Sequence, residues 1–251
     1  MRKIKPLIWL HAIRVRRYLL SILSGSVTDS IWMAVFLIGA YSSQGPTYAR
    51  EVFWALAAWS IIANAGWMIG GWIDYLSELG LLEPLDFSGV SPVVAAASRS
   101  FVIAIPTGLS SLITLLISFQ LGFNPLEISS PWLLALSLLI LWTQATAYGA
   151  ILASTVLLTS VPSALLDIAA LAYLGLLLAN YPAGNLQTFA FLPLLGPGYV
   201  ARQCVSGNPP LGVFLAVTVT TIVLSLFAIS YSRSVEKLVK KRAGYRAIAL
   251  H

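Results

Sequence analysis

Residues 72–92 read WIDYLSELGLLEPLDFSGVSP and interrupt a chain that is otherwise strongly apolar. Four of the nine acidic residues of the protein, Asp74, Glu78, Glu83 and Asp86, lie in this stretch. The sequence on either side is apolar over lengths that suffice to cross a membrane. The stretch therefore predicts a short acidic helix that stands in water between two membrane spans, a shape typical of a docking element.

The composition indicates that lipid surrounds most of the protein. Of its 251 residues, 58% are hydrophobic and only 10% are charged, and the mean hydropathy is +0.85. A soluble domain carries about a quarter charged residues. Most of the 15 basic residues gather at the two chain ends, at Arg2, Lys3, Lys5, Arg14, Arg16 and Arg17 and at Arg233, Lys237, Lys240, Lys241, Arg242 and Arg246. This distribution fits anionic lipid better than DNA, so we expect a lipid bilayer as partner and no nucleic acid.

Six segments have the roughly 20 mostly apolar residues that a helix needs to cross a bilayer. They cover residues 19–41, 52–73, 93–119, 132–159, 163–181 and 211–231. We expect an all-α integral membrane protein whose residues 1–251 form a single transmembrane domain. An amphipathic helix at 1–18 precedes the six spans within 19–231, and a basic tail follows at 232–251. Pro106 predicts a kink in the third segment.

The positions of Lys and Arg predict the orientation, because basic residues are retained on the cytoplasmic side. With the N-terminus inside, thirteen of the fifteen basic residues fall in the cytoplasm, and the outer loops contain only Arg50 and Arg202. Both termini of this multi-pass protein are therefore expected on the cytoplasmic side of the cell membrane. The acidic stretch then lies in the cytoplasm too. Either its carboxylates only keep a loop soluble, or they serve a partner.

The residues before the first span predict a moderately amphipathic helix. Its apolar side consists of Ile4, Leu7, Ile8, Val15, Tyr18, Leu19 and Ile22, whereas Lys5, Arg16 and Arg17 point away from it. A basic amphipathic segment of this kind lies along the membrane interface and leads into a span. A charged flank that only sets the topology is the alternative.

No catalytic constellation is found in the sequence. It contains no G-x-x-x-x-G-K-[ST] phosphate loop, so we do not expect the chain to hydrolyse ATP by itself. The two histidines, His11 and His251, sit at opposite ends outside the predicted spans, which argues against a serine hydrolase. Cys204 is the single cysteine and no metal cluster is indicated. Transport is the function class that remains.

Polar residues inside the predicted spans are candidates for a substrate pathway, because their insertion into lipid is costly. They are Asp29, Asn64, Gln144 and Asp167. For Asp29 the alternative is a helix cap at interfacial depth. For Asp167 it is a carboxylate near a helix N-terminus, where the helix dipole favours negative charge.

The segment after the fifth predicted span is long and half apolar. Residues 181–210 read YPAGNLQTFAFLPLLGPGYVARQCVSGNPP, and the prolines and glycines divide them into short pieces. These pieces predict short helices that dip into the outer leaflet. The backbone groups between them lack helical hydrogen bonds, so other parts of the protein must shield them from lipid. An ordinary outer loop with a mobile hairpin is the alternative.

Taken in order, these features resemble the membrane subunits of type-2 ATP-binding-cassette (ABC) exporters. The loop of that family between spans two and three often reads E-x-x-G-T-L-E-x-L followed by Ser-Pro. The chain has the same order in Glu78, Gly80, Leu82, Glu83, Leu85, Ser91 and Pro92, with Leu81 in place of Thr and a late Ser-Pro pair. The family's Asn-Pro-Leu-x-Tyr and following Arg are similar to Pro193, Tyr199 and Arg202, with Leu192 in place of Asn.

The resemblance implies a permease that forms the substrate pathway as a homo- or heterodimer. Separate cytoplasmic ATPase subunits would bind ATP and Mg, so no cofactor is expected in this chain. These subunits would grip one rigid coupling helix at residues 78–86. Its residues Leu79, Leu82 and Leu85 would fill an apolar groove, and Glu78, Glu83 and Asp86 would pair with basic groove rims.

The alternative is a membrane protein that works without ATP, either a secondary carrier or an assembly scaffold. Carriers usually contain internal repeats with broken helices in matching positions. Residues 1–125 and 126–251 show no convincing repeat, which counts against a carrier. Drug, lipid, glycan and peptide cargo all stay open within the exporter hypothesis.

Overall fold

The computed structural model describes residues 4–159, 163–179 and 186–242, and within these ranges every regular element is a helix. This confirms the all-α prediction. The N-terminal half contains α1 (Ile4–Arg17), α2 (Leu19–Ala65), the π-helix η1 (Gly66–Gly70), α3 (Gly71–Glu78), α4 (Leu82–Phe87), α5 (Pro92–Ala97), the 3-10 helix η2 (Ser100–Ile103) and α6 (Ala104–Gln120). The C-terminal half contains α7 (Pro131–Val156), α8 (Ser163–Leu178), α9 (Leu186–Phe189), α10 (Leu195–Ser206) and α11 (Leu211–Arg242).

In the described part of the chain, four helical stretches are long and apolar enough to cross a membrane. They are Leu19–Glu78, Pro92–Gln120, Pro131–Val156 and Leu211–Lys241. A fifth apolar stretch, Leu165–Leu178 in α8, is shorter. The first stretch contains both the first and the second predicted span. The predicted end of the fifth span, at residue 181, lies outside the described residues, as does the end of the tail beyond residue 242.

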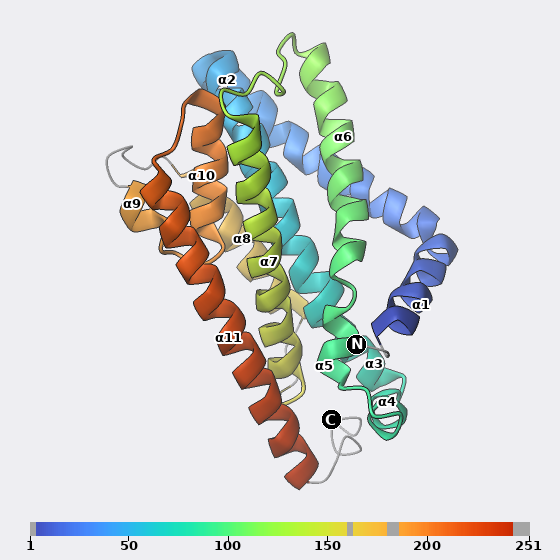
Figure 1. Cartoon of the computed structure of the whole chain (residues 1–251). Helices are drawn as coiled ribbons and strands as arrows, with labels where there is room; N and C mark the ends of the chain where they lie inside the picture. Colours follow the sequence, from blue (N-terminus) through green and yellow to red (C-terminus); the bar gives the residue numbers. More distant parts are fainter. Residues whose placement is uncertain (1–3, 160–162, 180–185, 243–251) are drawn as a thin grey trace.

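The first stretch is divided into two arms at Gly45, whose φ of 80° is readily adopted only by glycine. Pro46 follows and cannot donate a backbone hydrogen bond, so the helix bends here. The first arm, residues 19–44, runs obliquely across one side of the bundle (Figure 1). The second arm, residues 46–78, descends through the middle and supplies much of the buried core, including Leu56, Ile62 and Ile69.

The second arm packs closely against α7 because glycine allows the two backbones to approach. A Cβ atom added at Gly149 would lie 2.8 Å from the Cβ of Ile69 and 2.9 Å from the carbonyl oxygen of Ala65. One added at Gly70 would lie 2.9 Å from the Cβ of Leu152. Small residues at such crossings are typical of membrane helices, where dispersion contacts replace the hydrophobic effect.

The predicted kink in the third span is present as a break between α5 and α6. The 3-10 helix η2 separates them, and Pro106 lies in the first turn of α6. Proline lacks an N–H and its ring clashes with the carbonyl four residues earlier, which here belongs to Val102 in η2. An ordinary α-helix therefore cannot run through this position without distortion.

The bundle has two distinct ends. The segment from α3 to α5 and the C-terminal end of α11 lie at one end, and α1 lies at the side of the bundle towards the same end, which we name the terminal end (Figure 1). The bend at Gly45, the loop between α6 and α7 and the start of α11 lie towards the other end, which we name the distal end. Beyond residue 231, where the predicted last span ends, α11 continues as a helix to Arg242 at the terminal end.

Candidate functional site

The polar segment between α3 and α5 is the first candidate site, and it contains two short helical pieces. The α3 helix ends at Glu78, and Gly80 follows with a φ of 64°. The Leu81 N–H donates to the Leu76 carbonyl at 2.9 Å and the Gly80 N–H donates to the Ser77 carbonyl at 2.9 Å. These two bonds form the Schellman motif that stops a helix at a left-handed glycine.

The expectation of one rigid helix over residues 78–86 is therefore wrong. The α4 helix begins only at Leu82, and it ends in the same way at Gly89, whose φ is 69°. Here the Val90 N–H donates to the Leu85 carbonyl at 3.1 Å. Gly80 and Gly89 are the sequence signals for these two helix ends, because a left-handed backbone conformation at a helix C-terminus favours glycine.

One side of α4 is anchored in the protein itself. Leu82 is 2% exposed and belongs to the main hydrophobic core, and Leu85 is partly buried against that core. Leu82 is thus not part of any exposed surface. The Asp86 carboxylate pairs with the Lys240 ammonium of α11, with Oδ1 and Nζ 2.7 Å apart. Asp86 was predicted to pair with a basic residue of an ATPase subunit, but its partner in this structure is Lys240 of the same chain.

A second contact with α11 holds the start of α5. Ser91 is the N-cap of this helix, and its Oγ accepts the Val94 N–H at 3.1 Å. The same Oγ donates to the Glu236 carboxylate, which also accepts the Val93 N–H at 3.4 Å. Glu236 and Lys240 are four residues apart and so share one face of α11. Sequence reasoning assigned this basic helix end, including Lys240, to anionic lipid and to cytoplasmic placement, and it did not predict the contacts of Glu236 and Lys240 with α4 and α5.

The other side of the segment is uncovered by the described residues. Phe87 is 83% exposed and Leu79 is 49% exposed, and the Glu78 side chain is exposed beside them. Glu83 is half-buried. The segment therefore presents two large apolar side chains and acidic groups at the terminal end, while its opposite side is fixed to the core and to α11.

The structure does not bring the four pathway candidates together. Gln144 is fully buried, donates to the Thr221 hydroxyl at 2.8 Å and accepts the Leu194 N–H at 2.6 Å, so it ties α7 to α11 and to the start of α10. Asn64 donates to the hydroxyls of Ser60 at 3.1 Å and Thr107 at 3.2 Å. Both amides thus have structural partners.

The two aspartates of that set lie elsewhere. Asp29 is half-buried in the first arm of α2, and Asp167 is exposed on α8, where it accepts the Trp67 indole N–H at 3.2 Å. Among the described residues, no hydrogen bond or ion pair connects any two of Asp29, Asn64, Gln144 and Asp167. A continuous polar line through one chain is not formed by these four residues.

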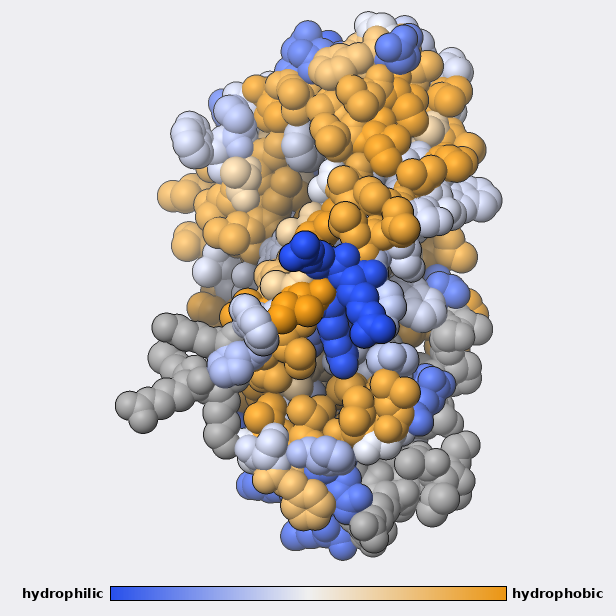
Figure 2. Space-filling model, turned by 90° about the vertical axis from the view of Figure 1, so that its right-hand side faces the viewer, coloured by the Kyte–Doolittle hydropathy of each residue, from blue (hydrophilic) through white to orange (hydrophobic). Residues whose placement is uncertain are grey.

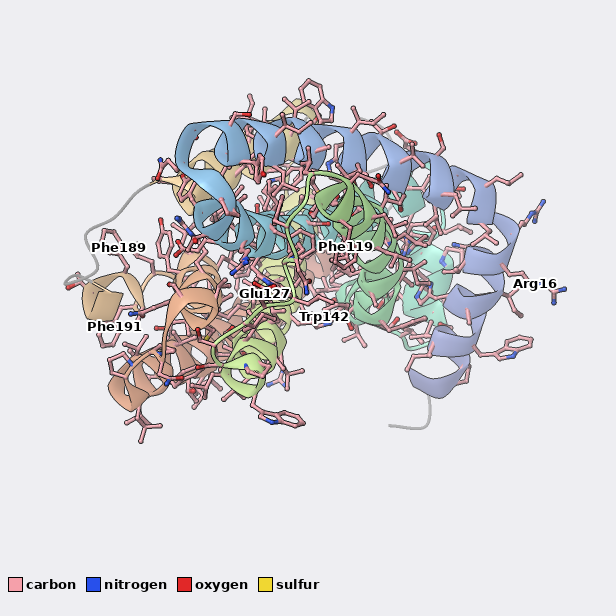
Figure 3. All side chains as sticks on the ribbon, turned by 90° about the horizontal axis from the view of Figure 1, so that it is seen from above. Arg16, Phe119, Glu127, Trp142, Phe189 and Phe191 are labelled. Atoms are coloured by element: carbon pink, nitrogen blue, oxygen red, sulfur yellow. The ribbon has the colours of Figure 1, made fainter. Side chains whose placement is uncertain are left out.

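Residues 186–206 form the short helices that the prolines and glycines predicted. The α10 helix is almost wholly buried from Leu195 to Val205. A Cβ added at Gly196 would lie 2.4 Å from the Ala190 carbonyl oxygen, so only glycine fits there. Phe189 and Phe191 lie on the side of the molecule opposite to Arg16 of α1 (Figure 3). Pro193 is exposed just before α10.

Tyr199 and Arg202 of α10 bind the end of α8, which leaves its last carbonyls without helical partners. The Tyr199 hydroxyl donates to the Leu176 carbonyl at 2.7 Å. The Arg202 Nη1 donates to the carbonyls of Leu177 at 2.7 Å and Ala179 at 3.1 Å, and its Nη2 lies 3.6 Å from the Glu51 carboxylate. The two residues therefore serve to fix α10 against α8 and the second arm.

A cationic cavity lies at the terminal end, between α1, the first arm of α2, α3 and η2. Its volume is about 400 Å³, and its lining includes His11, Arg14, Trp72 and Arg99. His11 is buried, and its Nε2 lies 3.1 Å from the Ser98 hydroxyl and 3.3 Å from the Ala95 carbonyl oxygen. Burial, followed by the neighbouring charge of Arg99, lowers the pKa of His11 to about 4. His11 is therefore neutral near pH 7.

A second, more apolar cavity of about 660 Å³ lies between α5, α7 and α11. Trp142 and Thr146 of α7, Ser225 of α11 and the Glu236 that holds α5 line it. Within the described ranges, no group of three or more His, Cys, Asp or Glu side chains could hold a metal ion. Comparison of the chain with protein-family models, with curated proteins and with solved structures found no match.

Proposed function

We propose that the chain is the membrane subunit of an ATP-driven exporter, and that the segment from α3 to α5 binds a separate ATPase subunit. One observation carries the proposal: this segment is fixed to the core and to α11 on one side and presents Leu79 and Phe87 on the other. Exposed aromatic and aliphatic anchors rimmed by acids are typical of a protein contact. A loop that served only solubility would not need them.

In the proposed membrane arrangement the chain crosses the bilayer six times. The two arms of α2, the stretch from α5 to α6, and the helices α7, α8 and α11 form the passes. An even number of passes is supported by the positions of α1 and of the end of α11, which share the terminal end (Figure 1). The abundance of Lys and Arg in α1 and at the end of α11 supports the proposal that this end faces the cytoplasm.

The proposed coupling depends on rigid connections between the docking segment and the passes. On one side, α3 is continuous with the second arm of α2. On the other, α5 leads into α6 and is held by Glu236, while Asp86 of α4 is held by Lys240. A displacement of α4 by an ATPase would therefore move the second arm of α2, α6 and α11 together. Such rigid connections suit a hinge or shear transition, whereas a flexible loop would absorb the displacement.

The substrate pathway is proposed to lie between two copies or homologues of this subunit. The four polar candidates are dispersed, and the two amides among them are engaged in structural hydrogen bonds. These four residues would therefore not line a pathway inside one chain, and a pathway shared between two subunits agrees better with their positions. ATP hydrolysis belongs to the separate ATPase, since the sequence has no phosphate loop.

The test is co-purification with matched variants. Tagged protein is purified from cells of its source in mild detergent, and the partner is identified by mass spectrometry and by its ATPase activity. We expect Phe87→Ser to reduce recovery of an ATP-binding-cassette ATPase at least about tenfold, the loss typical of a central apolar anchor. Trp132→Ser is the control, because Trp132 is 87% exposed at the start of α7, towards the distal end.

Two results would count against the proposal. If no ATPase accompanies the wild-type chain and transport proceeds in vesicles without ATP, the protein is a carrier. If an ATPase is recovered equally with Phe87→Ser and with the wild type, it binds elsewhere on the chain.

A further inference from the structure

The cationic cavity at the terminal end is not used by the proposed coupling. Arginines at three positions line it: Arg14 and Arg17 of α1, and Arg99 just before η2. No carboxylate is among its lining residues, and within the described ranges no Asp or Glu forms an ion pair with any of these three arginines. The cavity thus gathers positive charge without a counter-charge.

Two of these guanidinium groups are held over one aromatic ring. The Arg99 Cζ lies 3.7 Å and the Arg14 Cζ 4.9 Å from the centre of the Trp72 ring. Cation–π contact stabilises each charge but leaves the N–H groups at the guanidinium edges able to donate. The Arg99 Nη2 reaches only the Met68 sulfur, at 3.8 Å, and its buried Nε has no partner in the described structure. These donors lack a strong acceptor.

The position of α1 brings the arginines together. His11 anchors α1 to Ala95 and Ser98, which precede Arg99 in the chain by four residues and by one residue. Being neutral, His11 adds no positive charge to the group. In Figure 3, Arg16 points away from the bundle, so the helix separates an outward arginine from the two that line the cavity.

The surroundings are suited to an amphiphilic ligand. Apolar side chains such as Val15, Ile22 and Val102 line the cavity beside the arginines. Figure 2 views the side of the molecule on which α1 lies and shows a hydrophilic patch within a largely apolar surface. The basic last turn of α1, with Arg14, Arg16 and Arg17, lies on this side. A volume of about 400 Å³ is within the range of small-molecule sites.

We propose that the cavity formed by Arg14, Arg17, Arg99 and Trp72 binds a phosphate group, carried by an anionic lipid headgroup or present as a free anion. Arginine donates two parallel hydrogen bonds to phosphate, and the charges strengthen them. The ligand supplies the acceptors that the Arg99 donors lack and offsets the repulsion between adjacent arginines. This binding does not require an ATPase, so its test can fail while the proposed function holds, and the reverse is also true.

The lipid arm of the test uses native mass spectrometry of the full chain with phosphatidylglycerol or phosphatidylcholine at equal concentration. We expect the wild type to retain phosphatidylglycerol preferentially. Arg14→Gln and Arg99→Gln should each lower its apparent affinity about tenfold, the loss of one charge-assisted bond. Arg16→Gln is the matched control and should change it less than about twofold, because this side chain points outward.

The second arm titrates inorganic phosphate into the chain in phosphatidylcholine nanodiscs by calorimetry. Binding that Arg14→Gln abolishes identifies a free anion as a ligand, whereas preference for phosphatidylglycerol without phosphate binding identifies the lipid. Arg99→Lys keeps the buried charge and controls for misfolding of Arg99→Gln. The proposal is overturned if neither phosphatidylglycerol nor inorganic phosphate binds Arg14→Gln more weakly than Arg16→Gln.

Discussion

At the residue scale, buried polar groups in this chain mostly serve packing between helices. Gln144 and Arg202 each bind backbone atoms of elements far away in sequence, and these hydrogen bonds offset the cost of burying the two side chains. His11 has the same role at the terminal end, where it holds α1 on α5 and its C-cap. It differs from the other two in that its charge changes within an accessible pH range.

His11 makes stability depend on pH in a defined direction. Its pKa is lowered from 6.5 to about 4 by burial and by Arg99 and Arg14 nearby, so the unfolded chain binds a proton more readily. Stability should therefore fall as the pH drops from 6.5 to 4, by about 2 kcal/mol at pH 5. Free energies of unfolding in mixed micelles at pH 7.5 and pH 5 measure this, and His11→Asn should remove most of the difference. An equal pH dependence in both proteins would refute the assignment.

At the scale of elements, the contacts between α11 and the segment from α3 to α5 determine how firmly α4 is held. The Lys240 and Asp86 side chains are 51% and 30% exposed, so the pair contributes on the order of 1 kcal/mol or less to global stability. Its importance is local, because α4 is short and has one buried leucine, Leu82, as its main apolar anchor.

Charge reversal tests this contact. Asp86→Lys or Lys240→Asp alone should place like charges together and raise hydrogen exchange in residues 79–90 by up to about fivefold, equivalent to about 1 kcal/mol of local opening. The double variant should restore the wild-type rate, because the pair is re-formed with reversed sign. Exchange that stays raised in the double variant would show that these side chains are not coupled.

Sequence reasoning reached the helical class, a helix at the N-terminus, the break near Pro106 and the short helices after α8, because each depends on local composition. It missed the stop at Gly80, although the residue type signals it, since the resemblance favoured one continuous helix. It could not find the Asp86–Lys240 pair or the neighbours of Gln144, because these depend on how distant helices pack. Asn64 and Gln144 were predicted to line a substrate pathway because their hydrogen-bond partners on other helices could not be found from the sequence.

At the scale of the whole molecule, the docking segment and the cationic cavity share the terminal end. The second arm of α2 connects them, since Trp72 lies in α3 at its lower end and α4 follows. The distal end instead contains the ion pairs of Arg202 with Glu51 and of Arg50 with Glu127, and the buried α10.

Photo-crosslinking from position 87 tests the central claim most directly. The photoreactive residue p-benzoylphenylalanine, placed at Phe87 in cells, should form an ultraviolet-dependent product with an ATP-binding-cassette ATPase, and the same residue placed at Trp132 should not. Both positions are similarly exposed, at 83% and 87%. A product with an ATPase from position 87 alone is the predicted result. No ATPase product from position 87, or an equal yield from position 132, would contradict the docking of an ATPase on this segment.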